Sequence, residues 1–139
     1  GASVCAVPVR ACPEGWETID LSAVEGWTHR GDTALQPARG AGTCGGGGPN
    51  QILAFTAPAA GTYRADITES ASDTVLFARS HCGFVGADFE LACNDDIDGQ
   101  NMNFLSGLSV DLEAAQTVYF FVDSFRGADP GPYRLTIAQ

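Results

Sequence analysis

Hydrophobic and polar residues alternate along much of the chain after residue 50, which is the pattern of β-strands that bury one face. The alternation is clearest over residues 62–68 (TYRADIT). Residues 117–123 (TVYFFVD) are instead almost continuously apolar, which predicts a central strand buried on both faces. The other predicted strands are residues 17–21, 27–33, 52–56, 73–79, 89–93, 108–112 and 133–137. No helical period competes with them, so the chain is predicted to be all-β.

Short strands separated by frequent turn signals predict an antiparallel β-sandwich with jelly-roll-like character, pinned by disulfides. At 139 residues the chain has the length of one domain, and no linker divides residues 13–139. Residues 1–12 are expected to form an extended arm or edge strand, because Pro8 removes one hydrogen-bond donor from the backbone. Residues 37–48, which end in CGGGG, are predicted as a loop, since glycines offer no side chains to pack.

Two segments of the chain echo each other: APAAGTYRADI begins at Ala57 and LEAAQTVYFFV begins at Leu112. Each contains a short Ala-Ala connection, followed by a threonine that leads into a predicted strand. The echo predicts two hairpins in equivalent positions of one sandwich.

The charge balance is strongly acidic, with 17 acidic residues, 7 basic residues and a formal net charge of -10. All the basic residues are arginines. Nucleic acid and anionic lipid are bound through clusters of Lys and Arg, so neither is expected as a partner. No run approaches the ~20 apolar residues of a membrane-spanning helix. The opening GASVCAVPVRAC is consistent with a mature terminus left by cleavage of a signal peptide.

Five cysteines in a chain of this size favour an oxidising compartment, so the protein is expected to be secreted or displayed on the cell surface. Cys82 and Cys93 bracket the loop between two predicted strands, and a disulfide between them would contribute roughly 3 kcal/mol by restricting the unfolded chain. Cys12 and Cys44 form the second predicted pair, which leaves Cys5 for a bond to another chain. A Cys5–Cys44 pair with Cys12 unpaired is the alternative.

An acidic cluster, NDDIDG, follows Cys93 directly and has oxygen-bearing side chains at alternate positions before a glycine. This is the first half of a calcium-binding loop, because Ca²⁺ takes several oxygen ligands and a glycine permits the sharp turn. Leu105 stands where an EF-hand would need a glutamate, so the remaining ligands must come from elsewhere. The predicted calcium ligands are Asn94, Asp96, Asp98, the carbonyl of Gln100, and Asp73, Asp95 and Asp123. The alternative is a solvated acidic turn whose side chains cap their own backbone.

Several segments taken together resemble a known family. They are CGGGGPNQILAFTAPAAGTYRADI, DTVLFARSHC, LACNDD, LSVDLEAAQTVYFFVDSF and GPYRLTI, and they span residues 44–137. These segments resemble bacterial pre-peptidase C-terminal (PPC) domains, in the cysteine-containing form of myxobacterial and related secreted proteins. The resemblance implies a β-sandwich that is appended to secreted hydrolases and surface proteins and is not itself catalytic. It also implies calcium or a polymer such as collagen as a ligand, since some family members bind them.

The sequence contains none of the G-x-S-x-G, H-E-x-x-H or Walker-loop motifs of enzymes. We therefore expect a non-catalytic module, stabilised by calcium, that acts in adhesion or as a subunit of an extracellular filament or other assembly. The N-terminal arm, with Cys5, would add a strand to a neighbouring copy. The alternative is a targeting module of a secreted hydrolase that binds an extracellular polysaccharide or protein. Trp16 and Trp27 would stack on sugar rings if they are exposed and belong to the core if they are buried.

Overall fold

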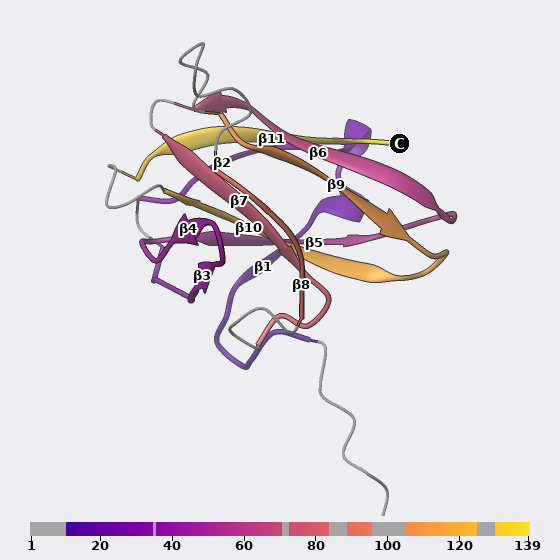
Figure 1. Cartoon of the computed structure of the whole chain (residues 1–139), viewed down its shortest axis with the longest axis horizontal. Coiled ribbons are helices and arrows are strands. Elements are labelled where there is room, and N and C mark those ends of the chain that lie inside the picture. The colour runs from indigo at the N-terminus through magenta and orange to yellow at the C-terminus, as the bar shows by residue number, and fades with distance from the viewer. Residues whose placement is uncertain (1–10, 35, 71–72, 84–88, 96–104, 125–129) are drawn as a thin grey trace, which may run out of the picture.

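The computed structural model describes residues 11–34, 36–70, 73–83, 89–95, 105–124 and 130–139. Within these residues the chain forms two β-sheets that face each other as a sandwich, with a short two-stranded ladder at one side (Figure 1). The predicted all-β sandwich is therefore confirmed.

One layer is a five-stranded sheet with the strand order β1-β5-β10-β7-β8. Its strands are β1 (Thr18–Asp20), β5 (Gln51–Thr56), β7 (Thr74–Arg79), β8 (Glu90–Asn94) and β10 (Thr117–Ser124). β10 lies between β5 and β7 and is buried along almost its whole length, as its apolar sequence predicts. β1 pairs with β5 in parallel, so this sheet is mixed and not purely antiparallel.

The other layer is a four-stranded sheet with the order β2-β11-β6-β9. Its strands are β2 (Thr28–Asp32), β6 (Gly61–Ser70), β9 (Gly107–Leu112) and β11 (Pro132–Ala138). Its strand pairs are antiparallel. Fully buried and more accessible residues alternate along β11, because one face of the strand meets the core and the other meets solvent.

The predicted strand over residues 17–21 is shorter in the structure, because the chain turns at its end into a 3-10 helix, η1 (Leu21–Ala23). Asp20 caps this helix, since its Oδ1 accepts a hydrogen bond from the backbone N–H of Ser22 at 3.1 Å. A second short helix, η2 (Glu25–Trp27), then leads into β2.

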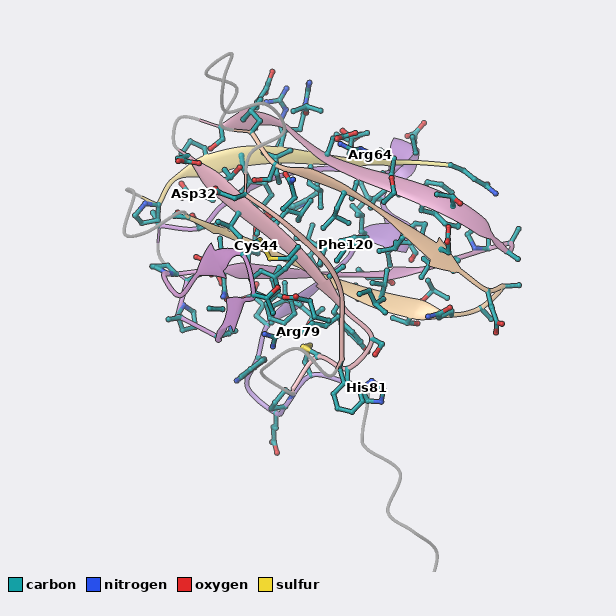
Figure 2. The ribbon with its side chains drawn as sticks, viewed as in Figure 1. Asp32, Cys44, Arg64, Arg79, His81 and Phe120 are labelled. Atoms are coloured by element: carbon teal, nitrogen blue, oxygen red, sulfur yellow. A yellow bond between two sulfur atoms is a disulfide. The ribbon has the colours of Figure 1, made fainter. Side chains whose placement is uncertain are left out.

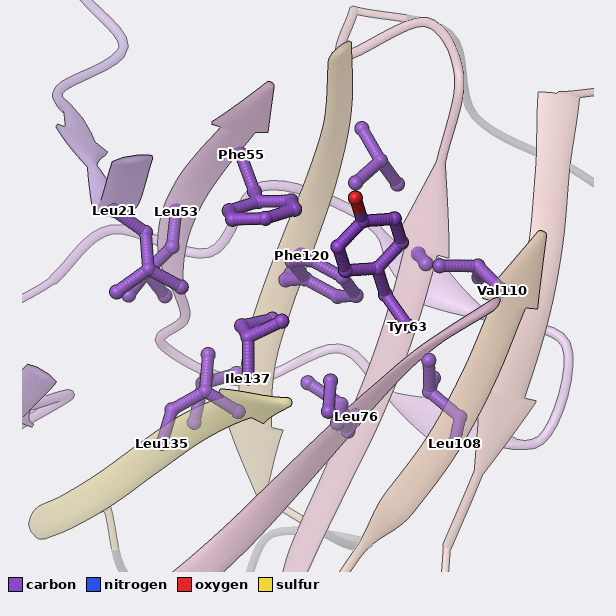
Figure 3. Packing of buried hydrophobic residues seen from close by; sticks show 14 of the residues in the cluster. Leu21, Leu53, Phe55, Tyr63, Leu76, Leu108, Val110, Phe120, Leu135 and Ile137 are labelled. Atoms are coloured by element: carbon purple, nitrogen blue, oxygen red, sulfur yellow. The ribbon is translucent and has the colours of Figure 1, made fainter. Parts of the chain in front are cut away.

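The main core lies between the two sheets (Figure 3). Phe55 and Phe120 of the five-stranded sheet and Tyr63 and Leu135 of the four-stranded sheet are completely buried in it. The rings of Phe55 and Tyr63 meet across the core with centroids 5.3 Å apart. Trp27 is partly buried and packs edge-on against Phe55 at 4.9 Å, so this tryptophan lies at the margin of the core.

The two echoing segments are corners at which the chain passes from one sheet to the other, and the prediction of hairpins is wrong. The first corner joins β5 to β6 and the second joins β9 to β10. They lie side by side, since Ala57 N donates to the Gln116 carbonyl at 2.9 Å and Ala115 N donates to the Ala57 carbonyl at 2.8 Å. A hairpin would keep both strands in one sheet, whereas each corner brings the apolar faces of consecutive strands together across the core.

A second apolar cluster lies on the outer face of the five-stranded sheet. Phe77 and Phe121 form its centre, with stacked rings 4.7 Å apart. Residues 11–16 pack over part of this face. The rest lies under residues 37–49, which we call the glycine cover and which contain the short ladder of β3 (Ala41–Gly42) and β4 (Gly45–Gly46). The predicted loop is therefore a lid over a buried sheet face.

Candidate functional site

Two disulfides attach the covering segments to the body of the protein, one at the turn after β7 and one on β8. Cys12 pairs with Cys82 and Cys44 pairs with Cys93, with Cα–Cα distances of 4.7 and 5.7 Å. Figure 2 shows Cys44 beside β7. The four cysteines predicted to form disulfides all do so, but both predicted pairings, Cys82–Cys93 and Cys12–Cys44, are wrong. The alternative pairing of Cys5 with Cys44 is wrong as well, and Cys5 itself lies outside the described residues.

The register of β7 against β8 explains why Cys82 does not pair with Cys93. Cys93 lies opposite Phe77, whereas Cys82 comes five positions after Phe77, beyond the end of β7. A disulfide needs Cα atoms within about 7 Å, and the register places Glu90, not Cys93, at the end of the strand pair that leads to Cys82. Cys93 instead faces the outer side of the sheet and meets Cys44 of the glycine cover, whose N–H lies 3.1 Å from the Cys93 sulfur.

Asp123 of β10 binds the glycine cover through hydrogen bonds. It is 1% exposed, and its carboxylate accepts hydrogen bonds from the backbone N–H groups of Gly47 at 3.0 Å and Gly48 at 3.2 Å. The side-chain amide of Asn50 donates to the same carboxylate at 3.1 Å and to the Gly40 carbonyl at 3.2 Å. Both ends of the cover are therefore bonded to one buried pair of side chains.

The need for glycine at position 46 follows from this buried carboxylate. Gly46 has a φ of 107°, and a Cβ at this position would lie 2.8 Å from Asp123 Oδ2. A larger residue would be strained and would push the cover away from the carboxylate. Burial raises the pKa of Asp123, and the hydrogen bonds that it accepts lower the pKa in part.

Arg79 is a second buried charged group under the cover. It is completely buried, and its guanidinium carbon lies 5.0 Å from the ring centroids of both Phe77 and Phe121. Its Nη2 donates to the Ala41 carbonyl at 2.8 Å. Burial lowers the pKa of Arg79 and the charge of Glu90 raises it. Sequence reasoning missed this residue, although its spacing of two from Phe77 already places it on the apolar face.

The segment predicted to bind calcium joins β8 to β9, and hydrogen bonds connect the described residues on its two sides. Asn94 Oδ1 accepts a hydrogen bond from Gly107 N at 3.0 Å. Ser106 Oγ lies 2.5 Å from the Asp95 carbonyl and 2.7 Å from the Thr74 carbonyl. Residues 94–95 and 105–107, which we call the neck, are therefore held together by main-chain and side-chain contacts.

The predicted calcium ligands fall into different environments. Three of them lie outside the described residues: Asp96, Asp98 and Gln100. Asp73 lies next to the neck and Asp95 belongs to it, and each has a buried carboxylate oxygen, Oδ1. Asn94 and Asp123 are engaged in the hydrogen bonds to Gly107 and to the glycine cover. In the part of the chain that the structure describes, no three His, Cys, Asp or Glu side chains form a group that could hold a metal ion.

A hollow of about 420 Å³ lies on the outer face of the five-stranded sheet, next to the segment that contains Trp16. We call it the aromatic hollow and define it by Trp16, Thr18, Asp20, Ala54, Thr56 and Tyr119. Trp16 is half-buried and packs against the outer cluster, so it lines the hollow while it anchors the covering segment.

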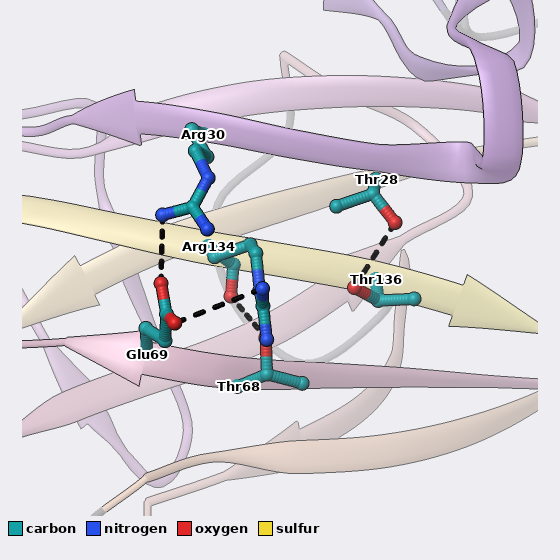
Figure 4. Close-up of polar contacts among 6 residues, drawn as sticks. All are labelled: Thr28, Arg30, Thr68, Glu69, Arg134 and Thr136. Atoms are coloured by element: carbon teal, nitrogen blue, oxygen red, sulfur yellow. Dashed lines mark hydrogen bonds and ion pairs between the residues drawn. The ribbon is translucent and has the colours of Figure 1, made fainter.

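The outer face of the four-stranded sheet is polar (Figure 4). Arg30 and Arg134 both contact Glu69, at 2.7 and 3.7 Å. The hydroxyl oxygens of Thr28 and Thr136 are 3.2 Å apart. These side chains are largely accessible to solvent. This face is therefore solvated, in contrast to the outer face of the five-stranded sheet, which is covered.

A scan against protein-family models and a search of curated proteins find no match to this chain. Several solved structures share its fold. The pre-peptidase C-terminal domain of collagenase from Bacillus anthracis has a TM-score of 0.51 and 14% identity, over 92% of this chain and 99% of that chain. PliG from Aeromonas hydrophila, a periplasmic inhibitor of g-type lysozyme, has a TM-score of 0.58 and 15% identity, over 87% and 94%. CorA, a surface-associated copper-binding protein of Methylomicrobium album BG8, has a TM-score of 0.52 and 5% identity, over 80% and 92%.

At these identities the similarity shows the fold alone. The chain has a PPC-like fold, which confirms the resemblance at the level of the fold. The two disulfides are consistent with a location outside the cytoplasm. Among the described residues, no helix has the length and apolar character needed to cross a membrane.

Proposed function

We propose that this chain is a non-catalytic module of a secreted or cell-surface protein that acts in adhesion or as a subunit of an extracellular assembly. The observation that supports it best is the crosslinking of the covering segments to the sheet, by disulfides that join positions 70 and 49 residues apart. In the chain-entropy description, each disulfide stabilises the fold by about 4 kcal/mol. Such stability suits a domain that has to persist outside the cell.

Within this role, we propose that calcium stabilises the segment between β8 and β9. The proposed ligands are Asp73, Asp95, Asp96, Asp98 and the carbonyl of Gln100. Asp73 and Asp95 bury carboxylate oxygens at the neck, and neighbouring carboxylates repel one another unless a cation lies between them. Asn94 and Asp123 are left out of the proposed set, because the hydrogen bonds that they accept already shape the sandwich.

Thermal unfolding with added calcium and after EDTA tests this part of the proposal. Calcium at about 100 times its Kd should raise the free energy of unfolding by about 2.7 kcal/mol, and EDTA should reverse the gain. Asp96→Ala should remove most of the increment. Asp111→Ala, an exposed carboxylate on β9 bonded to Thr62, should keep it. A Tm that responds to neither calcium nor EDTA would show that the segment is a solvated acidic turn.

The proposed assembly uses the N-terminal residues 1–10, which include Cys5. β1 and β8 are the outermost strands of the five-stranded sheet in the described residues, and an outermost strand can pair with a strand from another copy. β8 also carries Leu91, a large apolar side chain that is 44% exposed. The arm of one copy would add beside β8 of the next, and Cys5 would crosslink copies.

Non-reducing gels and negative-stain microscopy test assembly together. The wild type should give a ladder of crosslinked species, which Cys5→Ser should abolish, and filaments that Leu91→Lys should weaken by placing a charge on the strand edge. Ala138→Lys, at an exposed position of the inner strand β11, should assemble like the wild type. A wild type that stays monomeric by light scattering would rule out the assembly role and leave adhesion.

The second candidate function is to target a secreted hydrolase to a polymer, and the aromatic hollow beside Trp16 and Tyr119 favours it. Trp16 is half-buried where it lines the hollow, and a partly accessible indole ring suits a surface on which a sugar ring stacks. Retention of the protein on insoluble cellulose, chitin or collagen tests this role. A monomer that is retained would support targeting, and a monomer that binds none of the three would contradict it.

A further inference from the structure

We propose that the aromatic hollow is a binding site for a neutral glycan. Trp16 would provide the stacking surface, and Asp20 and Tyr119 would form hydrogen bonds with the sugar hydroxyls. This inference rests on the second candidate function, to which it gives a specific site. It follows from the shape of the hollow, from its free polar atoms and from its charge.

The hollow exists because one position in a row of side chains across the sheet is small. Asp20 of β1, Ala54 of β5 and Tyr119 of β10 are neighbours in register. Ala54 contributes only a methyl group, so the surface of the sheet is lower at this position than at the two larger side chains beside it. Trp16 lines the hollow from the covering segment, which the disulfide at Cys12 fixes to the body of the protein. The hollow is an open depression of about 420 Å³, which suits a ligand that lies along the surface of the sheet.

The side chains around the hollow have polar atoms that are free to bind a ligand. Within the described part of the chain, neither Trp16 Nε1 nor the Tyr119 hydroxyl has a hydrogen-bond partner. Asp20 uses Oδ1 to accept the bond from Ser22 N, which leaves Oδ2 for a donor. A sugar hydroxyl both donates and accepts, so neighbouring hydroxyls can satisfy the indole N–H and the carboxylate together.

The charge of the hollow disfavours anionic and cationic ligands in different ways. Its described lining contains the carboxylate of Asp20 and no arginine, in a chain of net charge -10, so a phosphate or an acidic sugar would be repelled. A basic side chain would pair with Asp20 but has no acceptor for the N–H of Trp16. A neutral pyranose has both donors and acceptors, together with an apolar C–H face that can lie on the indole ring.

The indole N–H signals of the protein provide a direct test, because the chain has only two tryptophans. Cellopentaose, laminaripentaose and chitopentaose would each be titrated up to about 10 mM, which covers weak millimolar binding. At least one of them should shift the Trp16 signal in a proton–nitrogen correlation spectrum. The Trp27 signal should stay in place, because this ring packs against Phe55 in the core.

A matched pair of substitutions tests the hollow itself. Ala54→Leu fills it without removing a polar group and should weaken binding of the responding glycan by at least about tenfold, the scale of one lost stacking contact. Ala138→Leu makes the same change on the exposed face of the other sheet and should bind like the wild type. Tyr119→Phe removes one hydroxyl and should weaken binding by about threefold to tenfold. Unfolding curves of each variant establish that the fold is intact.

Each negative outcome has a distinct meaning. Failure of all three glycans to shift the Trp16 signal, or wild-type binding by Ala54→Leu, would overturn the assignment of the hollow. A larger shift with N-acetyl-lysinamide than with any glycan would overturn the choice of a neutral ligand. Retention of both the wild type and Ala54→Leu on cellulose or chitin would preserve the targeting function and place it on another surface. A wild type that none of the insoluble polymers retains would overturn the targeting function as well.

Discussion

The two sheets of the sandwich differ most in their outer faces. The five-stranded sheet has an apolar cluster around Phe77 and Phe121 on its outer side, beneath the glycine cover and residues 11–16. The four-stranded sheet presents arginine, glutamate and threonine side chains to solvent (Figure 4). In the residues that the structure describes, the molecule is therefore a sandwich with a third layer on the outer side of the five-stranded sheet.

This difference is already present in the strand sequences. Every residue of β7 is buried, whereas fully buried and more accessible residues alternate along β11. A strand that faces apolar material on both sides gains burial from each side chain, at roughly 25 cal/mol per Å² of apolar surface. A charged residue in such a strand has to find partners, as Arg79 does between two rings and a carbonyl. Polar substitutions should therefore be costly on the covered face and nearly neutral on the open face.

The largest effect should come from the centre of the covered face. Phe121→Ala removes a ring that is completely buried and stacked on Phe77, and it should lower the free energy of unfolding by about 3–5 kcal/mol. Thr136→Ala on the open face should change it by less than about 0.5 kcal/mol. Urea unfolding of both variants measures the contrast. A cost for Phe121→Ala below about 1 kcal/mol would mean that the outer cluster is not a true core.

The next effect concerns the attachment of the cover. Replacing Cys44 and Cys93 together by alanine should cost about 2–4 kcal/mol, because the unfolded chain regains the freedom of a long loop. Limited proteolysis should then cut the glycine cover faster than in the wild type, while β6 and β11 remain protected. An unchanged unfolding midpoint would show that the hydrogen bonds of Asp123 hold the cover without the disulfide.

Asp123→Asn should lower the free energy of unfolding by about 1–3 kcal/mol. The carboxylate accepts bonds from Gly47, Gly48 and Asn50, and an amide at the same place must turn an NH₂ group toward at least one of these donors. Asp111→Asn, which changes an exposed carboxylate bonded to Thr62, should be close to neutral. Urea unfolding compares the two, and equal costs would contradict the role of Asp123 in holding the cover.

The pH dependence of the difference in stability between the wild type and Asp123→Asn gives a second test of the role of Asp123. Burial raises the pKa of Asp123, so the folded protein binds its proton more tightly than the unfolded chain does. The stability from this group is fully present below the unfolded pKa of about 3.9 and is lost as the pH rises through the folded pKa. The stability advantage of the wild type over Asp123→Asn should therefore shrink from about pH 4 upward. If the advantage of the wild type instead grows with pH, the hydrogen bonds to Asp123 lower its pKa by more than burial raises it.

The strands could be predicted because alternation depends only on near neighbours in the sequence. The pattern of residues 62–68 corresponds to β6, and the apolar run of residues 117–123 corresponds to β10. The corners after Ala57 and Leu112 could not be distinguished from hairpins, because both begin with the same local turn chemistry. They differ only in whether the next strand pairs with the previous one, which depends on the whole fold.

The disulfide pairing and the role of Asp123 were out of reach for a related reason. Cys93 pairs with Cys44 because of the β7–β8 register and the path of the glycine cover. Both depend on contacts between residues that are far apart in the sequence. Asp123 was predicted as a calcium ligand because the acidic cluster supplies only part of the oxygen ligands that Ca²⁺ needs. Its contacts with Gly47 and Gly48 cross 76 and 75 positions of sequence, and no local pattern links them. Long-range hydrogen bonds and disulfide pairings therefore could not be predicted from the sequence, whereas the strands could be predicted from their periodicity.

The smallest effect should come from the open face. Arg30 and Glu69 form an ion pair at 2.7 Å with side chains that are 68% and 51% exposed, so Arg30→Ala should cost less than about 0.5 kcal/mol. Arg134 remains 3.7 Å from Glu69 and keeps that carboxylate paired. The cost should vanish in high salt, which screens exposed charges, whereas the cost of Asp123→Asn should persist. Urea unfolding in low and high salt measures both. A salt-resistant loss above about 1 kcal/mol for Arg30→Ala would show that this face is also buried, and the contrast between the two sheets would then fail.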